Sequence, residues 1–223
     1  MRPVELLARE RTADDEELTL TRRAGVYWLT LSGQTLMSSL AHGSELALAS
    51  LSCTGLAAKT GRSRPRVVIG GLGFGYTARA ALDNLPAGAS VVVWEISPMV
   101  LAANRGEVGD LAGRPLDDPR LRVVSGDVWD AFDREPFDAI LLDADNGPNA
   151  FTLRRNERLY SPAGLARLHR SLVPGGVLAI WSEARDNGFG RRLTAAGFAT
   201  EVHGARGAER AGTHFTIFVA RRR

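Results

Sequence analysis

The sequence contains a single cysteine, and this scarcity excludes several kinds of site. Cys53 alone leaves no partner for an intrachain disulfide and no set of thiolates for a zinc site. The histidines show no metal-ligand spacing, so we expect no metal. Lys59 is the one lysine, and arginine therefore carries nearly all of the positive charge.

Long hydrophobic runs are absent as well. No apolar run approaches the roughly 18 residues that a membrane helix needs. Residues 1–18 are charged and lack the apolar core of a secretory signal. We therefore expect a cytoplasmic protein with no membrane attachment. The net charge is +3, but the arginines are scattered and no nucleic-acid motif accompanies them, so we expect no nucleic-acid partner.

The hydrophobic pattern changes near residue 60. Two alternating runs within residues 17–31 predict a β-hairpin. Residues 43–58 have the pattern of a helix, with Ser44 as the expected N-cap. We expect residues 1–60 to form an N-terminal β-hairpin and helix segment, and residues 61–223 to form the nucleotide-binding catalytic domain.

After residue 60, strand patterns alternate with helical patterns. The strands are rich in Val, Ile and Leu on both faces, which is typical of a parallel sheet covered by helices. This alternation predicts an α/β domain with a doubly wound, Rossmann-like sheet. The predicted strands are residues 66–71, 90–96, 121–127, 137–145, 175–183, 199–205 and 213–222. The predicted helices are residues 75–85, 97–111, 162–176 and 190–198.

A glycine-rich turn follows the first strand of this domain. It contains Gly70, Gly71, Gly73 and Gly75. Glycines at such a turn let the backbone turn tightly and approach a ligand closely. The spacing is not the GxGxxG of dinucleotide-binding folds. A kinase-type phosphate loop is also excluded, because Ala58 stands where the glycine before Lys59 would be required.

Acidic residues end the next two strands. Glu95 lies 20 residues after Gly75, where an acid is placed to accept both ribose hydroxyls of a nucleoside. Asp127 ends the third strand and is placed to bond the amino group of adenine. The carboxyl ends of parallel strands meet at one edge of the sheet, so these residues predict an adenosine-type cofactor. The glycine spacing favours an S-adenosylmethionine-type sulfonium ligand.

The fourth strand is hydrophobic but ends in Asp143, Asp145 and Asn146, with no cation between the two carboxylates. From Asp117 to Asp145 the chain has nine acidic residues and three arginines. A local acidic field suits a cationic ligand, so we expect a ligand of positive charge near this strand end. For Asp145, the role of a cap for the following turn remains an alternative.

Together these motifs resemble the spermidine synthase (polyamine aminopropyltransferase) family, as a divergent bacterial-type member. The resemblance covers roughly residues 33–183 and rests on VVIGGLGFG, VVVWEISPMV, DDPRLRVVSGDVWD and FDAILLDADNGPNAFTLRRNERLY. It implies a class I S-adenosylmethionine methyltransferase-like fold. It also implies transfer of an aminopropyl group from decarboxylated S-adenosylmethionine to a polyamine acceptor, and a possible homodimer.

The resemblance also implies roles for single residues. The cofactor-binding set would be the four glycines of the turn together with Glu95 for the ribose and Asp127 for the adenine. Asp143 and Asp145 would be the catalytic residues that bind the attacking amine, a small cationic amine substrate, and take its proton. Weaker candidates for substrate contact are His42, Glu45 and Asn146.

The sequence departs from the family pattern at two loops. Leu72, Gly73 and Phe74 stand where the family has Gly, Asp and Gly, so an acidic contact is lost. The loop after the fourth strand reads DADNGP instead of DSSDPxGP, and Asp145 matches the second aspartate only with a shift of one position.

Two other functions remain open at this point: an S-adenosylmethionine-dependent methyltransferase, and a non-catalytic relative that binds a nucleoside or a polyamine. The direction of Asp143 and Asp145 separates the two cofactors. At about 4 Å and an effective dielectric constant near 20, each charge pair is worth roughly 4 kcal/mol before desolvation. Carboxylates that face the tail of the cofactor would therefore favour the decarboxylated form.

Overall fold

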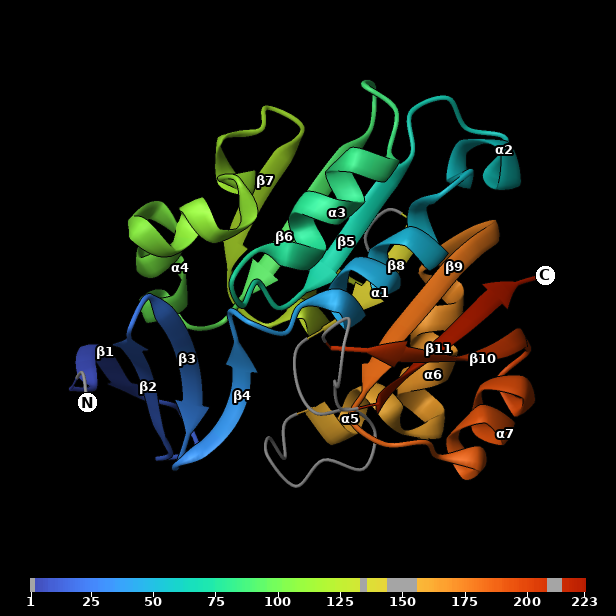
Figure 1. Ribbon diagram of the computed structural model, residues 1–223. Helices are drawn as coiled ribbons and strands as arrows, with labels where there is room; N and C mark the ends of the chain where they lie inside the picture. The colour runs from blue at the N-terminus through green and yellow to red at the C-terminus, as the bar shows by residue number, and fades with distance from the viewer. Residues whose placement is uncertain (1–2, 133–135, 144–155, 208–213) are drawn as a thin grey trace.

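The computed structural model describes residues 3–132, 136–143, 156–207 and 214–223. Its main body is a seven-stranded sheet covered by helices on both faces, and a separate four-stranded sheet stands at one end (Figure 1). Asp145 and Asn146, two of the predicted site residues, lie outside the described residues.

The N-terminal sheet is antiparallel throughout, with the order β1-β2-β3-β4. Its strands are β1 (Glu5–Arg11), β2 (Glu17–Arg23), β3 (Val26–Leu31) and β4 (Gln34–Ser38). The hairpin predicted within residues 17–31 is β2 and β3, and it is confirmed. The flanking strands β1 and β4 were not predicted. In β1 a register shift between Leu6 and Ala8 interrupts the alternation of side chains that reveals a strand in a sequence.

The main sheet has the order β10-β11-β9-β8-β5-β6-β7. Its strands are β5 (Arg66–Gly70), β6 (Ser90–Glu95), β7 (Leu121–Ser125), β8 (Phe137–Leu142), β9 (Leu172–Ser182), β10 (Phe198–Arg206) and β11 (His214–Arg222). Strands β5 to β9 run parallel, whereas β11 and β10 are antiparallel. The predicted doubly wound sheet is therefore confirmed, with an antiparallel edge.

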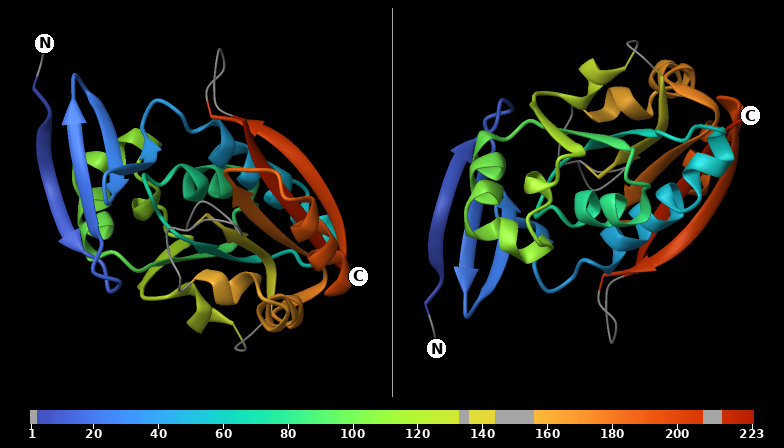
Figure 2. Two further views of the ribbon diagram at one scale, coloured as in Figure 1. Left: turned by 90° about the horizontal axis from the view of Figure 1, so that it is seen from below. Right: turned by 90° about the horizontal axis from the view of Figure 1, so that it is seen from above.

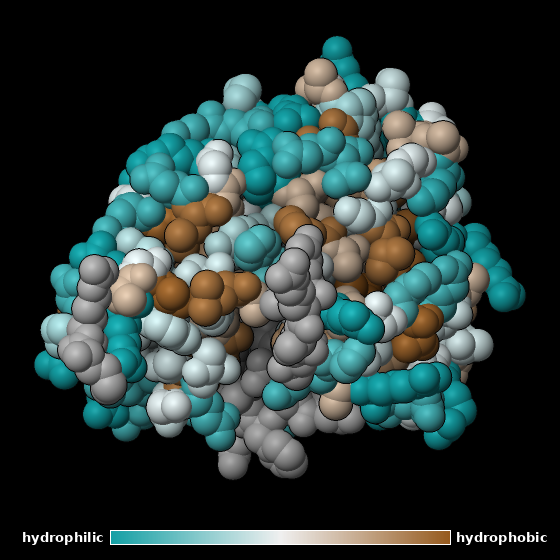
Figure 3. Space-filling view, in the orientation of Figure 1, coloured by the Kyte–Doolittle hydropathy of each residue, from teal (hydrophilic) through white to brown (hydrophobic). Residues whose placement is uncertain are grey.

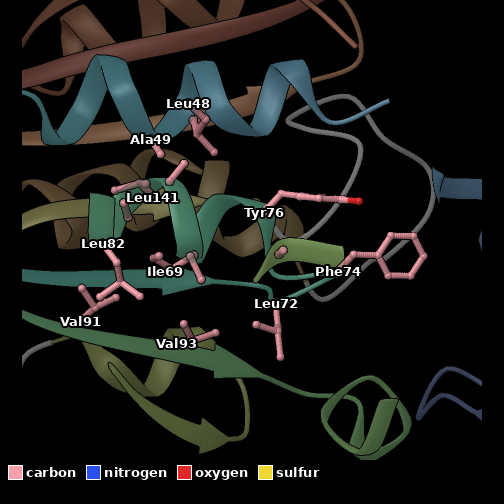
Figure 4. Packing of buried hydrophobic residues seen from close by; sticks show 14 of the residues in the cluster. Leu48, Ala49, Ile69, Leu72, Phe74, Tyr76, Leu82, Val91, Val93 and Leu141 are labelled. Carbon is pink, nitrogen blue, oxygen red and sulfur yellow. The ribbon is translucent and has the colours of Figure 1, made fainter. Parts of the chain in front are cut away.

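The helices form two layers that enclose this sheet (Figure 2). They are α1 (Gly43–Cys53), α2 (Leu56–Thr60), α3 (Tyr76–Asn84), α4 (Pro98–Arg105), α5 (Glu157–Tyr160), α6 (Pro162–Arg170) and α7 (Asn187–Ala195). On one face, Ile69 and Val93 pack with residues of α1, α3 and α4 (Figure 4). On the other face, Ile140 and Leu178 pack with residues of α5, α6 and α7. The central strands β5 and β8 thus bury both faces, as their largely apolar sequences predicted, whereas no residue of the edge strand β7 is fully buried.

Four predicted helices differ from the observed ones. The helix expected over residues 190–198 lies three residues earlier, at Asn187–Ala195, and Phe198 begins β10. The helix expected over residues 43–58 is divided, because Gly55 takes a left-handed conformation (φ 68°) between α1 and α2. The helix expected over residues 97–111 ends at Arg105 and gives way to a 3₁₀ helix over Glu107–Ala112. The helix expected over residues 162–176 ends at Arg170, and the chain enters β9 two residues later.

The predicted N-cap Ser44 is wrong by two positions. His42 occupies the N-cap of α1, without a side-chain cap hydrogen bond. Ser44 is buried within the first turn, where its hydroxyl donates to Glu45 at 2.6 Å. The Ser44 hydroxyl therefore bonds the Glu45 carboxylate and does not accept from a backbone amide of the helix, as an N-cap would.

Helix α1 joins the N-terminal sheet to the main one. Leu48 and Ala49 on this helix are fully buried and pack in the same cluster as Ile69 of β5 (Figure 4). The division of the chain at residue 60 remains a prediction.

The surface that is visible in Figure 3 is hydrophilic over most of its periphery, and hydrophobic side chains gather nearer its centre. Leu40 and Leu46, in the segment that leads into α1 and on the helix itself, are among the exposed large hydrophobic residues. Within the described residues, no helix combines the length and the apolar character that are needed to span a bilayer.

Candidate active site

The carboxyl ends of four parallel strands border one cavity of about 400 Å³. A cavity of this size lies within the range of about 300–1,000 Å³ that small-molecule ligands occupy. Its walls include five of the predicted site residues and a sixth that was a weaker candidate. These are Gly71, Gly73, Glu95, Asp127 and Asp143, with Glu45. The position matches the rule that ligands of open α/β sheets bind at the carboxyl ends of strands.

The glycine turn after β5 brings backbone, not side chains, to the cavity. Gly73 has φ 52°, and a Cβ atom built on it would lie 2.8 Å from the sulfur of Met37. The Met37 sulfur in turn accepts a hydrogen bond from the amide of Phe74 at 3.2 Å. Asn104 secures the turn from α4 by donating to the carbonyl of Gly73 at 2.8 Å. The positive φ favours glycine at position 73, and a side chain there would also have to displace the end of the Met37 side chain.

Gly70 and Gly75 are not among the residues that line the cavity. Gly70 is the last residue of β5, and a Cβ atom on it would meet the side chain of Val128 at 3.0 Å. Gly75 is the N-cap of α3, in a left-handed conformation. Both glycines therefore shape the turn, while Gly71 and Gly73 face the cavity.

Glu95 ends β6 and is held at the rim by backbone amides. Its Oε2 accepts from the amide of Leu72 and its Oε1 from the amide of Ser97, each at 2.8 Å. The side chain is 7% exposed, and burial raises the pKa of its carboxyl. Each oxygen keeps a lone pair beyond the bond to the amide. Glu95 is therefore fixed in orientation and able to accept two further hydrogen bonds, as the two hydroxyls of a ribose require.

Asp127 lines the cavity after β7, but both of its oxygens already accept hydrogen bonds. Its Oδ1 accepts from the amide of Trp129 at 2.9 Å. Its Oδ2 accepts from the guanidinium of Arg158 on α5 at 2.5 Å. The same guanidinium lies over the ring of Trp129. An adenine amino group at Asp127 would have to share or replace the bond from Arg158.

Asp143 follows β8 directly and is the predicted catalytic residue that the structure describes. Its amide donates to the carbonyl of Gly70 at 2.9 Å, which places it beside the glycine turn. Its Oδ2 accepts from the hydroxyl of Thr77 in the first turn of α3 at 2.5 Å. The side chain lines the same cavity as Glu95 and Asp127. The acidic residues at the ends of β6, β7 and β8 thus line one cavity.

Glu45 and His42, the weaker candidates from the sequence, have different positions. Glu45 is 6% exposed and lines the cavity from the first turn of α1. His42 is not among the lining residues, and its ring stacks on Tyr76 with 4.2 Å between centroids. Glu45 therefore belongs to the cavity wall, whereas His42 supports the packing of α1 against α3.

Sequence reasoning missed the wall that the N-terminal sheet provides. Residues 10–14, which form the end of β1 and the start of the turn after it, line the cavity. Leu18 of β2 and Leu29 of β3 line it as well. Leu36 and Met37 of β4 complete this wall. The alternation of β2 and β3 indicates which side chains face inward, but no local pattern shows that this inner face meets the rim of another sheet.

No metal site accompanies the cavity in the described part of the chain. There, His, Cys, Asp and Glu side chains form no group of three or more that could hold a metal ion. The site offers carboxylates, backbone amides and an apolar wall. These are groups that bind a nucleoside and a cation.

Comparisons with known proteins point to one family. No family model matches the sequence. Polyamine aminopropyltransferases of Mycobacterium tuberculosis (strain H37Rv) and Mycobacterium bovis are each 32% identical to the chain over 123 residues. The match covers 53% of this chain and 22% of each relative, so it spans less than a quarter of the length of these proteins.

Solved structures match over nearly the whole chain. A spermidine synthase in complex with the transition-state analogue AdoDATO has a TM-score of 0.75 at 18% identity, covering 98% of this chain and 74% of that one. The spermidine synthase from Thermotoga maritima has a TM-score of 0.71 at 16% identity, covering 98% and 73%. These matches confirm the predicted fold.

Proposed function

We propose that this chain is a transferase of the spermidine synthase type, which moves an aminopropyl group from decarboxylated S-adenosylmethionine to a small amine. The observation that carries the proposal is the single cavity bordered by Gly71, Glu95, Asp127 and Asp143. The curated relatives and the solved structures that resemble the chain bear the names of such enzymes. The activity of the whole protein and a homodimeric state are part of this proposal.

The residues of the cavity fit an adenosine. Glu95 offers two oriented oxygens to the ribose hydroxyls. Ile96, whose side chain is 51% exposed, and Trp94 provide apolar surface on the same wall, where an adenine ring would be sheltered. Asp127 lies next to them and would accept from the adenine amino group alongside Arg158. In this assignment Gly71 and Gly73 allow the sulfonium end to lie close to the backbone.

The donor supplies a carbon next to a positively charged sulfur. A bond forms between the amine nitrogen and that carbon, while the bond from carbon to sulfur breaks and its electron pair remains on sulfur. The products are an aminopropylated amine and neutral 5′-methylthioadenosine. The amine attacks only in its uncharged form, although a free alkylammonium has a pKa near 10.4.

Asp143 acts on the amine in this proposal. Its Oδ2 is held by Thr77, so the carboxylate has a fixed position at the rim. There it binds the ammonium form, orients the nitrogen toward the carbon and accepts the proton that the attacking nitrogen loses. Alignment of nitrogen, carbon and sulfur contributes more to the rate than removal of the proton. Asp145 is assigned the same role by resemblance and lies outside the described residues.

A product screen tests this function. The purified protein is incubated with putrescine, cadaverine or spermidine and with decarboxylated or ordinary S-adenosylmethionine, and the products are identified by mass spectrometry. We expect an aminopropylated amine and 5′-methylthioadenosine with the decarboxylated donor. A methylated product with ordinary S-adenosylmethionine would reject the aminopropyl assignment.

The variant Asp143→Asn links the activity to this site. We expect kcat/KM to fall by about 100-fold or more, as for loss of a group that positions and deprotonates a reactant. Asp83→Asn is the matched control, because Asp83 is an exposed carboxylate at the far end of α3. Equal activity of Asp143→Asn and the parent would show that Asp143 has no part in turnover.

A further inference from the structure

The carboxylate of Asp127 is fixed at both of its oxygens. Its Oδ1 accepts from the backbone amide of Trp129 at 2.9 Å, and its Oδ2 accepts from the guanidinium of Arg158 at 2.5 Å. The two donors come from different elements, the 3₁₀ helix Val128–Ala131 and α5. Because a carboxylate oxygen carries two lone pairs, each oxygen keeps one for a ligand. The protein itself therefore sets the orientation of Asp127 at the wall of the cavity.

Trp129 takes part in both of these contacts. Its amide bonds Oδ1, and its ring centroid lies 4.9 Å from the Cζ atom of Arg158, whose guanidinium bonds Oδ2. A second guanidinium, that of Arg167 on α6, has its Cζ atom 4.2 Å from the same centroid. Cations within about 6 Å of an indole ring are attracted to its face. Trp129 is thus held by Arg167 and in turn holds Arg158 against Asp127.

The residues that follow Arg158 anchor its backbone. Leu159 and Tyr160 are buried and pack in the core on that face of the sheet. The carbonyl of Arg158 accepts from the hydroxyl of Ser161, the N-cap of α6, at 2.8 Å. The side chain of Arg158 is 45% exposed and is not among those that line the cavity, whereas that of Asp127 is 20% exposed and lines it. Arg158 therefore acts on a ligand through Asp127.

The charge of Arg158 favours a neutral donor at Asp127. A carboxylate that leaves water to meet an uncharged N–H group loses hydration free energy, and a paired cation offsets part of that loss. Arg158 supplies this cation from the side away from the cavity. The amino group of adenine is such an uncharged donor.

We propose that Arg158 and Trp129 are positioning residues that orient Asp127 toward the amino group at position 6 of adenine, and so determine the preference of the cavity for a 6-aminopurine. The inference rests on the proposed function, because it assumes a nucleoside whose ribose is bound by Glu95. With the ribose held there, the direction of the base toward Asp127 is fixed. The amino group donates to a remaining lone pair of Asp127, while Arg158 and the Trp129 amide keep the carboxylate from turning away.

Isothermal titration with two nucleosides isolates this contact. One probe is 5′-methylthioadenosine, and the other is the same compound with hydrogen in place of the 6-amino group. We expect the parent to bind 5′-methylthioadenosine more tightly by about 10-fold or more, as for one hydrogen bond to a charged group. In Arg158→Met, which keeps an unbranched side chain but lacks the charge and the donors, this ratio should fall to about 3-fold or less. The affinity for the 6-hydrogen probe should stay within about 2-fold of the parent.

Two further variants test the parts of the unit separately. Trp129→Leu keeps the backbone amide that bonds Oδ1 but removes the ring beside Arg158, so it should lower the ratio by a smaller factor than Arg158→Met does. Arg158→Lys keeps a positive charge and a donor, but it lacks the planar guanidinium. It should therefore restore part of the preference for the 6-amino group.

Arg192 provides a closely matched control. It is 43% exposed, lies 3.6 Å from Asp186, and its Cζ atom is 5.1 Å from the ring centroid of Phe189. Asp186 is the N-cap of α7, as Asp127 is the N-cap of its 3₁₀ helix. Neither Arg192 nor Asp186 is among the residues that line the cavity. Arg192→Met should therefore leave the affinities for both nucleosides unchanged.

Several results would overturn the inference. If Arg158→Met keeps the ratio of the parent, Asp127 needs no such support. If Arg158→Met binds 5′-methylthioadenosine more tightly than the parent does, Arg158 competes with the base. An equal loss of affinity for both probes would make Arg158 a structural residue of α5. An equal effect of Arg192→Met would mean that the change in ratio is not specific to this site.

The parent protein separates failure of the inference from failure of the proposed function. If the parent binds both probes with equal affinity, Asp127 does not recognise the amino group, and the inference is wrong while the nucleoside site stands. If the parent binds neither probe, the proposed function fails, and the inference fails with it for that distinguishable reason.

Discussion

The hydroxyl of Thr77 lies 2.5 Å from Oδ2 of Asp143, although 66 residues separate them in the chain. Thr77 is in the first turn of α3, just past the glycine turn, and its side chain is buried. The adjacent strands β5 and β8 run parallel and bring the two residues together. The glycine turn therefore also positions the Thr77 hydroxyl beside the Asp143 carboxylate at the end of β8.

Removal of the Thr77 hydroxyl should impair turnover through Asp143. We expect Thr77→Val, which keeps the shape, to lower kcat/KM by about 10-fold, the effect of about 1.4 kcal/mol lost from one hydrogen bond to a charged group. Thr77→Ser should restore most of the activity, because it keeps the donor. Thr60→Val on α2 is the control, since the Thr60 hydroxyl bonds only the backbone of its own helix. A Thr77→Val protein with parental kinetics at every pH would show that Asp143 needs no such support.

The affinity for nucleosides should depend on pH through Glu95. Burial raises the pKa of this carboxyl above its ordinary value, and the ribose hydroxyls need its ionised form. The affinity for 5′-methylthioadenosine should therefore fall as pH decreases through that raised pKa, and recover as pH rises. Titration calorimetry between pH 5 and 8 checks this. Glu95→Gln should bind weakly at all pH values, and a variant that retained the pH dependence of the parent would assign it to another group.

Gly73 should not tolerate a side chain. Gly73→Ala combines a positive φ with a Cβ atom 2.8 Å from the Met37 sulfur. Gly61→Ala is the matched control, because Gly61 also has a positive φ (69°) but nothing within 4 Å of its Cβ. We expect Gly73→Ala to lower the melting temperature more than Gly61→Ala does.

A double-mutant cycle isolates the contact with Met37. The loss caused by Gly73→Ala should be smaller in a Met37→Ala background, because the sulfur that meets the new methyl group is gone. If the losses in melting temperature from Gly73→Ala and Met37→Ala simply add, the effect of Gly73→Ala comes entirely from the backbone conformation.

Asp118 should stabilise the fold at neutral pH. Hydrogen bonds from the side chain of Arg120 are the main reason that the pKa of Asp118 is lowered to about 2. The Arg120 guanidinium also donates to the carbonyls of Leu82 and Leu85, so the pair fastens the end of α3 to the start of β7. We expect Asp118→Asn to reduce the free energy of unfolding by about 1–2 kcal/mol at pH 7.

The pH dependence of this loss has a definite sign. A carboxyl whose pKa is lowered by folding stabilises the protein above its unfolded pKa of about 3.9, and the stabilisation disappears as pH falls toward the folded value. The difference between the parent and Asp118→Asn in urea unfolding should therefore shrink between pH 4 and pH 2. Asp117→Asn, at an exposed neighbouring position, should show neither effect. If the difference in unfolding free energy between the parent and Asp118→Asn stays constant from pH 4 to pH 2, the charge of Asp118 is not what stabilises the fold.

The helices and strands that the sequence predicted well are those whose pattern reflects burial. Strands β5, β6 and β8 are rich in apolar residues because helices cover both faces of the sheet. The predicted ends of helices were wrong where the backbone conformation of single residues ends the helix. Gly55 divides the helix predicted over residues 43–58, and the helix predicted to end at Gly175 and Gly176 stops at Arg170.

The sequence by itself determined the strands of the sheet, its glycine turn and the acidic residues that follow three of the strands, because apolar runs and the polar residues after them are local patterns. It also indicated that Asp143 would lie near Glu95 and Asp127, since parallel strands bring their carboxyl ends to one edge. Only the tertiary structure decided which partner each carboxylate has. Arg158 reaches Asp127 and Thr77 reaches Asp143 from distant parts of the chain. Such pairings depend on how helices pack across the sheet, and no short stretch of sequence contains both members.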